Sequence, residues 1–281
     1  MKKIIAFILV VILSMMLCSC GKAADYEAAV ALMTAEKYEE AIAAFTELGD
    51  YEDSLQLLEQ CKNRMAYREA ESLLEKGDYA GAWELFEKIE NTEKTEELDC
   101  NLMACAWGMV RDYLDEEGPF QVKDTQYDVE NDTQVESVCQ IEKQGKRVTA
   151  TIQSTEIISY PILSVSYTTI TDTTVSFDGK ETQLELKAEA KHTMKGKKGA
   201  STFQNVGTCL WDIASYKADT PVTWAEYIHI GTDGEMDDTR SAPAFDGRVT
   251  MQQTIIASCL EQLLEDADLG LSMADLGFTN Y

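Results

Sequence analysis

The sequence predicts an α+β protein, with a module of paired helices over residues 24–117 and a domain of mostly antiparallel strands over residues 120–281. Up to Gly118-Pro119, apolar residues recur every three or four positions, the period of an amphipathic helix. Beyond that point apolar and polar residues alternate, the period of a strand with one buried face. The boundary falls at Pro119 because proline disfavours helical geometry in the residue before it.

Residues 1–19 have the composition of an export signal. Lys2 and Lys3 precede an apolar run over residues 4–17, interrupted by Ser14, and small residues then surround Cys20. The run is shorter than the roughly 20 apolar residues that cross a bilayer as a helix. A positive start, a short apolar run and a small-residue end are typical of a cleaved signal peptide.

The stretch Leu17-Cys18-Ser19-Cys20 resembles the lipobox of bacterial lipoproteins, with leucine three residues before the modified cysteine and a small residue just before it. The resemblance implies cleavage after Ser19 and a diacylglycerol thioether on Cys20, with residues 20–23 as lipidated start and short tether. Cys18 does not fit, because the bulky Leu17 would stand where the peptidase needs a small residue. Two acyl chains, palmitate among them, would hold the protein on the extracytoplasmic face of the cell membrane. The alternative is an ordinary cleaved signal or an uncleaved anchor.

Acidic residues outnumber basic ones, 50 to 24, and give a formal net charge of −26. Loss of residues 1–19 removes two lysines and no acid, so the mature chain carries −28. Nucleic-acid binding depends on neutralising phosphates with Lys and Arg, so this balance excludes a nucleic-acid partner. We interpret the acidic surface as soluble and self-repelling, outside the membrane.

Six cysteines follow Cys20, and their sequence positions leave many disulfide pairings open. They are Cys61, Cys100, Cys105, Cys139, Cys209 and Cys259. No CxxC motif signals a redox or zinc site, so we expect mostly buried thiols that behave as small apolar side chains.

Residues 24–117 contain an internal repeat, because the segments over residues 29–45 and 70–86 align at a constant offset of 41. The matched pairs are Ala29 with Ala70, Leu32 with Leu73, Tyr38 with Tyr79, Ala41 with Ala82 and Phe45 with Phe86. Self-similarity of this kind indicates stacked helical units. Each copy is expected to break into two helices, near Glu36-Lys37 or Gly77-Asp78. A further helix over residues 93–116 is expected to cap the stack.

This pattern resembles the tetratricopeptide repeat, whose small, turn and aromatic positions match Ala70, Gly77, Asp78, Tyr79, Ala82 and Phe86. The period of 41 departs from the family's 34, and the closing proline is missing. We expect the additional residues, 49–62, to lengthen the helix that leads into the second copy.

In that family the first helix of each pair lines a concave groove that holds a partner's peptide. By position, the groove residues here would be Tyr26, Val30, Met33, Arg64, Tyr67, Arg68 and Leu74. Arg64 and Arg68 stand one turn apart and could clamp a partner's carboxylate. The alternative is that they pair with neighbouring acids such as Glu69 or Glu71. The asparagine and additional lysines of carboxylate-gripping family members are not found.

The second half predicts a run of short antiparallel strands and a final helix. The expected strands are 134–143, 147–159, 162–170, 173–178, 181–192, 203–213 and 222–230. Asp178-Gly179 predicts a hairpin turn, because such turns need residues that accept positive φ. A helix over residues 248–267 carries an apolar stripe suited to a sheet face. Ser272 and Asp275 are spaced as a capping box.

No catalytic, phosphate-binding or dinucleotide motif occurs, so the sequence predicts no enzyme, cofactor or metal. His192 and His229 lack a spaced partner, and ordinary strand positions explain them. The acidic stretch 233–238 is more simply a solvated turn than a calcium loop. The five lysines between Lys187 and Lys198 are more simply an exposed hairpin than a lipid or teichoic-acid contact.

We therefore expect a lipid-anchored envelope protein that binds another protein or a peptide. The alternative is a lipoprotein that holds a small or lipid-like molecule in its α+β domain.

Overall fold

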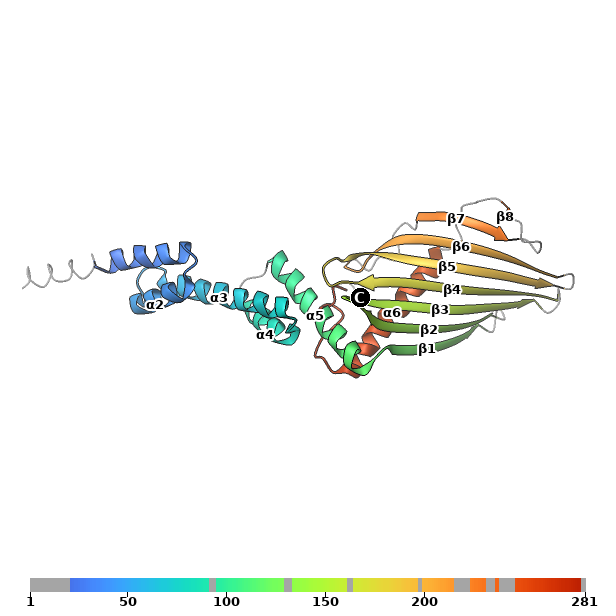
Figure 1. Cartoon of the computed structure of the whole chain (residues 1–281), viewed down its shortest axis with the longest axis horizontal. Coiled ribbons are helices and arrows are strands. Elements are labelled where there is room, and N and C mark those ends of the chain that lie inside the picture. The colour runs from blue at the N-terminus through green and yellow to red at the C-terminus, as the bar shows by residue number, and fades with distance from the viewer. Residues whose placement is uncertain are drawn as a thin grey trace, which may run out of the picture. The chain divides into compact units, whose positions relative to one another are not determined.

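The computed structural model describes residues 21–90, 95–128, 133–160, 164–196, 199–214, 223–230, 236–237 and 246–278. The chain divides into two compact units, Met1–Thr95 and Glu96–Tyr281. The first is helical, and the second combines an antiparallel sheet with two helices (Figure 1). The α+β prediction is confirmed. The predicted signal peptide, Cys20 and most of the acidic stretch 233–238 lie outside the described residues.

The helical unit consists of a helix over residues 21–34 followed by α2 (Tyr38–Leu48), α3 (Ser54–Lys76) and α4 (Tyr79–Glu90). Both helix breaks fall where the repeat predicts them. Glu36 has φ +59° and Gly77 has φ +84°, the left-handed conformation that ends many helices. An equivalent backbone hydrogen bond closes each break: Lys37 N donates to Leu32 O in the first copy, and Asp78 N donates to Leu73 O in the second.

The two copies of the repeat form the same packing. Ala29, Ala70, Ala41, Ala82, Phe45 and Phe86 are all fully buried. Tyr26 stands edge-on to Phe45 at 6.3 Å, and Tyr67 stands edge-on to Phe86 at 5.3 Å. Alanine at these positions lets the paired helices approach closely, and the phenylalanine fills the space between them. The repeat read from the sequence is therefore also a repeat in packing.

Helix α3 is long because it serves both copies. Its first half places Leu58 and Cys61 in the core of the first helix pair. Its second half pairs with α4. The lengthening expected from residues 49–62 is thus borne out as a helix of 23 residues.

The sheet of the second unit has eight strands within the described residues, arranged in chain order as an antiparallel meander. They are β1 (Phe120–Asp128), β2 (Thr133–Gln144), β3 (Arg147–Tyr160), β4 (Val165–Phe177), β5 (Gln183–Gly196), β6 (Gly199–Asp212), β7 (Thr223–Ile230) and β8 (Met236–Asp237). Two expectations were wrong. Strands β1 and β8 were missed, and the strands expected over 162–170 and 173–178 are the single strand β4. Its polar Asp172 does not interrupt it, because the side chain is exposed and accepts a hydrogen bond from Gln153 on β3 at 2.9 Å.

Helices α5 (Glu96–Glu117) and α6 (Asp246–Ala267) cover one face of this sheet. The final helix confirms the stripe predicted over 248–267, since Ile256, Leu260 and Leu263 are fully buried. Helix α5 differs from expectation: it packs on β2 and β3 and belongs to the second unit, where we expected a cap on the repeats. The boundary therefore lies after Thr95 and not after residue 117.

Aromatic side chains fix α5 and the C-terminal tail to the sheet. Trp107 stacks on Phe177 with ring centroids 4.4 Å apart, and its indole N–H donates to the carbonyl of Leu276 at 3.1 Å. Trp211 and Phe278 complete the cluster. The predicted cap is present, because Asp275 accepts hydrogen bonds from the backbone and hydroxyl of Ser272, both at 2.7 Å.

Candidate functional site

The predicted groove residues of the first helix pair take part in its own packing. Tyr26, Val30 and Met33 are half-buried and pack against the core formed by Ala29, Phe45 and neighbouring residues. The Tyr26 hydroxyl donates a hydrogen bond to the Asp53 carboxylate, and this bond raises the pKa of Tyr26. These three side chains therefore stabilise the packing of the helix pair itself.

Two residues of the second copy are placed in the same way. Tyr67 is half-buried against Phe86. Leu74 is half-buried, and its carbonyl accepts the backbone N–H of Gly77 at the helix end. They stand at positions equivalent to Tyr26 and Met33, and Tyr67 contributes to packing through its contact with Phe86.

The two arginines differ. Arg68 forms an ion pair with Glu36, donates to the Glu36 carbonyl at 3.4 Å, and lies over the ring of Tyr38 at 4.9 Å. Arg68 thus ties α3 to the first helix break. Arg64 is exposed and forms no ion pair among the residues that the structure describes. Of the two arginines expected to clamp a partner's carboxylate, Arg68 thus already has a carboxylate partner within the chain, Glu36.

Beside Arg64, sequence reasoning missed an exposed apolar side chain, Met65, which is 39% exposed. Residues three and four apart on a helix are neighbours, so Arg64, Met65 and Arg68 share one region of α3. We call these three residues the α3 patch. In the sequence, the signal for this patch is Met65, an apolar residue that lies outside the series of buried α3 positions Leu58, Cys61 and Ala70.

The backbone register places the two histidines two strands apart. His192 is half-buried on β5, and its Nδ1 lies 3.0 Å from the hydroxyl of Thr169 on β4. The backbone register places His229 opposite Phe203, which in turn pairs with His192. Two strand spacings, roughly 10 Å, therefore separate the two backbone positions.

Buried polar side chains occur on α6 and on strands β3 and β4. Gln252 on α6 is 1% exposed and donates from Nε2 to the Ser154 hydroxyl on β3 at 2.6 Å. Its carbonyl oxygen and the Thr173 hydroxyl on β4 are buried without a hydrogen-bond partner among the described residues. A buried polar atom without a partner is costly, so each such atom needs an explanation. In the sequence, the signal for these buried polar side chains was the pair Gln252-Gln253 within the otherwise apolar stripe of α6.

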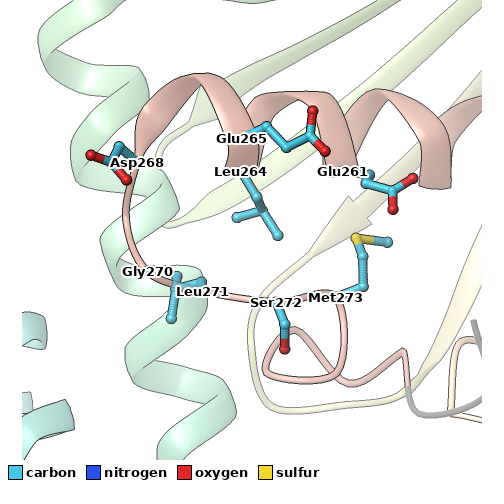
Figure 2. A pocket seen from close by; sticks show the side chains of 8 residues that line it. All are labelled: Glu261, Leu264, Glu265, Asp268, Gly270, Leu271, Ser272 and Met273. Atoms are coloured by element: carbon cyan, nitrogen blue, oxygen red, sulfur yellow. The ribbon is translucent and has the colours of Figure 1, made fainter.

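A shallow pocket of about 370 Å³ lies between the end of α6 and the tail (Figure 2). Carboxylates of Glu261, Glu265 and Asp268 surround it. Within the described ranges, His, Cys, Asp and Glu nowhere gather in a group of three or more that could hold a metal ion. Among these same residues, no helix is both long enough and apolar enough to span a membrane.

No protein-family model, curated protein or solved structure matches the chain. The tetratricopeptide and lipobox resemblances therefore stay predictions based on the residues.

Proposed function

We propose that this protein is held on the extracytoplasmic face of the membrane by a lipid anchor. We further propose that its helical unit binds a protein or peptide partner. The lipobox-like Leu17-Cys18-Ser19-Cys20 supports the anchor. The observation that carries the binding role is the repeated helix pair, with the same buried alanines, the same tyrosine–phenylalanine contacts and the same helix breaks. Repeated helical units form extended surfaces that such proteins use for binding.

The α3 patch supports a partner of particular chemistry. Arg64 offers an exposed guanidinium that can bind a carboxylate through two parallel hydrogen bonds. Met65 next to it offers a polarizable apolar side chain suited to adaptable contacts. We expect a partner segment that presents an acidic side chain or C-terminal carboxylate beside an apolar residue. The surrounding net charge favours a segment that is otherwise neutral or basic.

Site-specific cross-linking tests this proposal in the cell that makes the protein. A photoreactive residue at Met65 should capture a partner in the envelope, whereas one at Lys187 on the sheet should not. Lys187 is a matched control because it is also exposed and lies in the other unit. Capture at Lys187 without capture at Met65 would contradict a binding role for the helical unit.

The captured partner then allows a measurement of affinity. Arg64→Ala should weaken binding about 10- to 100-fold, the range expected for a charge-assisted hydrogen bond. Arg64→Lys keeps the charge but loses the planar guanidinium, so its affinity should lie between those of the unchanged protein and of Arg64→Ala. Equal affinity of the unchanged protein and both variants would show that Arg64 does not contribute to binding.

The anchor has its own test. The full chain labelled with an alkynyl fatty acid should carry the label, and Cys20→Ala should abolish it and release the protein without detergent. Cys18→Ala is the matched control and should change neither result. Label that survives Cys20→Ala would overturn the lipobox assignment.

A second function is favoured by the orphaned polar atoms of Gln252 and Thr173: the sheet unit would hold a small polar molecule beneath α6. Native mass spectrometry of the full chain, isolated from its own cell, should then show a bound mass that Gln252→Leu removes. Gln253→Leu, also buried, is the control. A chain without bound mass that becomes more stable on Gln252→Leu would exclude this function.

A further inference from the structure

We propose that Cys139 and Cys259 form a disulfide bond that fastens helix α6 to strand β2 in the exported protein. Cys139 lies near the middle of β2, on the face of the sheet that α6 covers. Cys259 lies in the second half of α6. Both side chains are 1% exposed, inside the interface between helix and sheet.

The Cys259 side chain contacts Cys139 across the interface between α6 and β2. The Cys259 thiol donates a weak hydrogen bond to the Cys139 carbonyl, with Sγ and O 3.9 Å apart. A hydrogen bond between the two thiols, together with burial, raises the pKa of Cys139. A disulfide requires two cysteines on closely adjacent backbone segments. The contact of the Cys259 thiol with the Cys139 carbonyl places these two residues next to each other.

Neither Cys61 nor Cys105, the other two thiols that the structure describes as buried, shares this arrangement. Burial alone raises the pKa of Cys105 and that of Cys61, without a second thiol among the causes. Cys61 also belongs to the other unit. Among the described residues, Cys139 and Cys259 are thus the pair that the fold brings together.

The position of the pair suggests why a covalent link is useful. Helix α6 follows β8 in the sequence but packs on β1, β2 and β3, at the other end of the strand order (Figure 1). The two cysteines are 120 residues apart. A cross-link that closes a long loop restricts the unfolded chain more than one that closes a short loop. The bond would hold α6, which follows β8 in the sequence, against the strands at the opposite end of the strand order.

The chemistry is thiol–disulfide exchange with an external disulfide, such as oxidised glutathione or the disulfide of an exported oxidoreductase. One cysteine thiolate attacks the external disulfide and releases one thiol, which leaves a mixed disulfide. The second cysteine attacks that bond, releases the second thiol and completes the Cys139–Cys259 bond. The two protein thiols lose two protons and two electrons, and the external disulfide is reduced to two thiols.

Burial and the raised pKa of Cys139 make its thiolate scarce in the folded protein. We therefore expect the bond to form while the chain folds, before α6 closes over the sheet. The oxidising compartment follows from the proposed export, but the pairing depends on the fold alone. An experiment with a supplied oxidant consequently tests the pairing independently of the anchor.

The test refolds the reduced full chain from denaturant with mixed oxidised and reduced glutathione. Peptide mapping without reductant should find the peptides of Cys139 and Cys259 joined, at a mass two hydrogens below their sum. Reduction should lower the midpoint of thermal unfolding of the sheet unit by several degrees. Transfer of the already folded, reduced chain into the same mixture should give the bond far more slowly.

Matched variants complete the test. Cys105→Ser replaces another buried cysteine of the same unit and should keep both the joined peptides and the effect of reductant. The double change Cys139→Ala with Cys259→Ala should remove both. The proposal is overturned if both thiols remain alkylatable after oxidative refolding, or if either pairs with another cysteine such as Cys209.

Discussion

At the scale of single residues, burial gives chemically identical side chains different properties. Cys100 and Cys105 both lie on α5, but Cys100 is exposed and Cys105 is fully buried. Burial disfavours the charged thiolate and raises the pKa of Cys105 to about 12. The sequence predicted mostly buried thiols but could not tell these two apart, because both lie on one helix that was expected to cap the repeats.

We predict that the two thiols differ sharply in their rate of alkylation. A thiol of ordinary pKa, about 8.5, is roughly one-quarter thiolate at pH 8, and a thiol with a pKa of about 12 is roughly one ten-thousandth thiolate. Cys105 should react with iodoacetamide at least a thousandfold more slowly than an ordinary thiol, whereas Cys100 should react readily. Peptide mapping after timed labelling measures both rates. Similar rates for the two residues would contradict the packing of α5.

A second residue carries a backbone conformation that its side chain disfavours. Glu36 has φ +59°, whereas its counterpart in the second copy is Gly77. Glu36→Gly should raise the free energy of unfolding by about 1 kcal/mol in high salt, where the exposed ion pair with Arg68 contributes little. Glu36→Gln, which removes the charge and keeps the side chain, is the control and should give no such gain. Urea unfolding followed by helical circular dichroism measures the difference.

At the scale of elements, turns and helix ends follow local chemistry. Asp178 accepts hydrogen bonds from the backbone of Lys180 at 3.0 Å and of Glu181 at 3.4 Å, and Gly179 has φ +76°. The hairpin predicted at Asp178-Gly179 is therefore present, because aspartate and glycine suit it in any context. Its second role, contact with α5, depends on residues far away in the chain. A Cβ at Gly179 would lie 2.9 Å from the Cβ of Trp107.

Two glycine substitutions separate these roles. Gly145→Ala, in the turn between β2 and β3, adds a Cβ in open space at φ +64° and should cost about 1–2 kcal/mol from the backbone alone. Gly179→Ala adds a clash with α5 to the same backbone cost and should lower stability by a further 1–3 kcal/mol. Urea unfolding followed by tryptophan fluorescence measures both. Equal losses would mean that α5 does not press on this hairpin.

At the scale of the whole molecule, α5 belongs with the sheet because Trp107 fills the space against Phe177 and its indole N–H has a buried acceptor. The amphipathic pattern of α5 predicted a helix correctly but could not name the surface that it covers. Strand β1 was missed for a related reason. Its backbone pairs with β2 along its whole length, yet its side chains show little of the alternation that sequence reasoning requires.

The unit boundary leads to a prediction about truncated chains. A chain of residues 96–281 should unfold in urea at the same midpoint as the sheet unit of the full chain. A chain of residues 120–281 lacks α5 and should be unfolded or at least 3–5 kcal/mol less stable, the loss typical of removing one large aromatic side chain from a core. Tryptophan fluorescence follows both, since Trp211 remains in each chain. A stable 120–281 chain would restore the boundary predicted from the sequence.

The sequence by itself determined the features that depend on neighbouring residues. These are the repeat with its small and aromatic core positions, the helix breaks, the hairpin at Asp178-Gly179 and the apolar stripe of α6. Helical and strand periods and turn chemistry act over a few residues, so their signals survive without the rest of the fold. The tertiary structure alone decided that α5 joins the sheet, that Arg68 binds Glu36, that Gln252 is buried beside Ser154, and that Cys139 meets Cys259. Each of these joins residues distant in the chain, and a partner is fixed only when packing brings the two surfaces together.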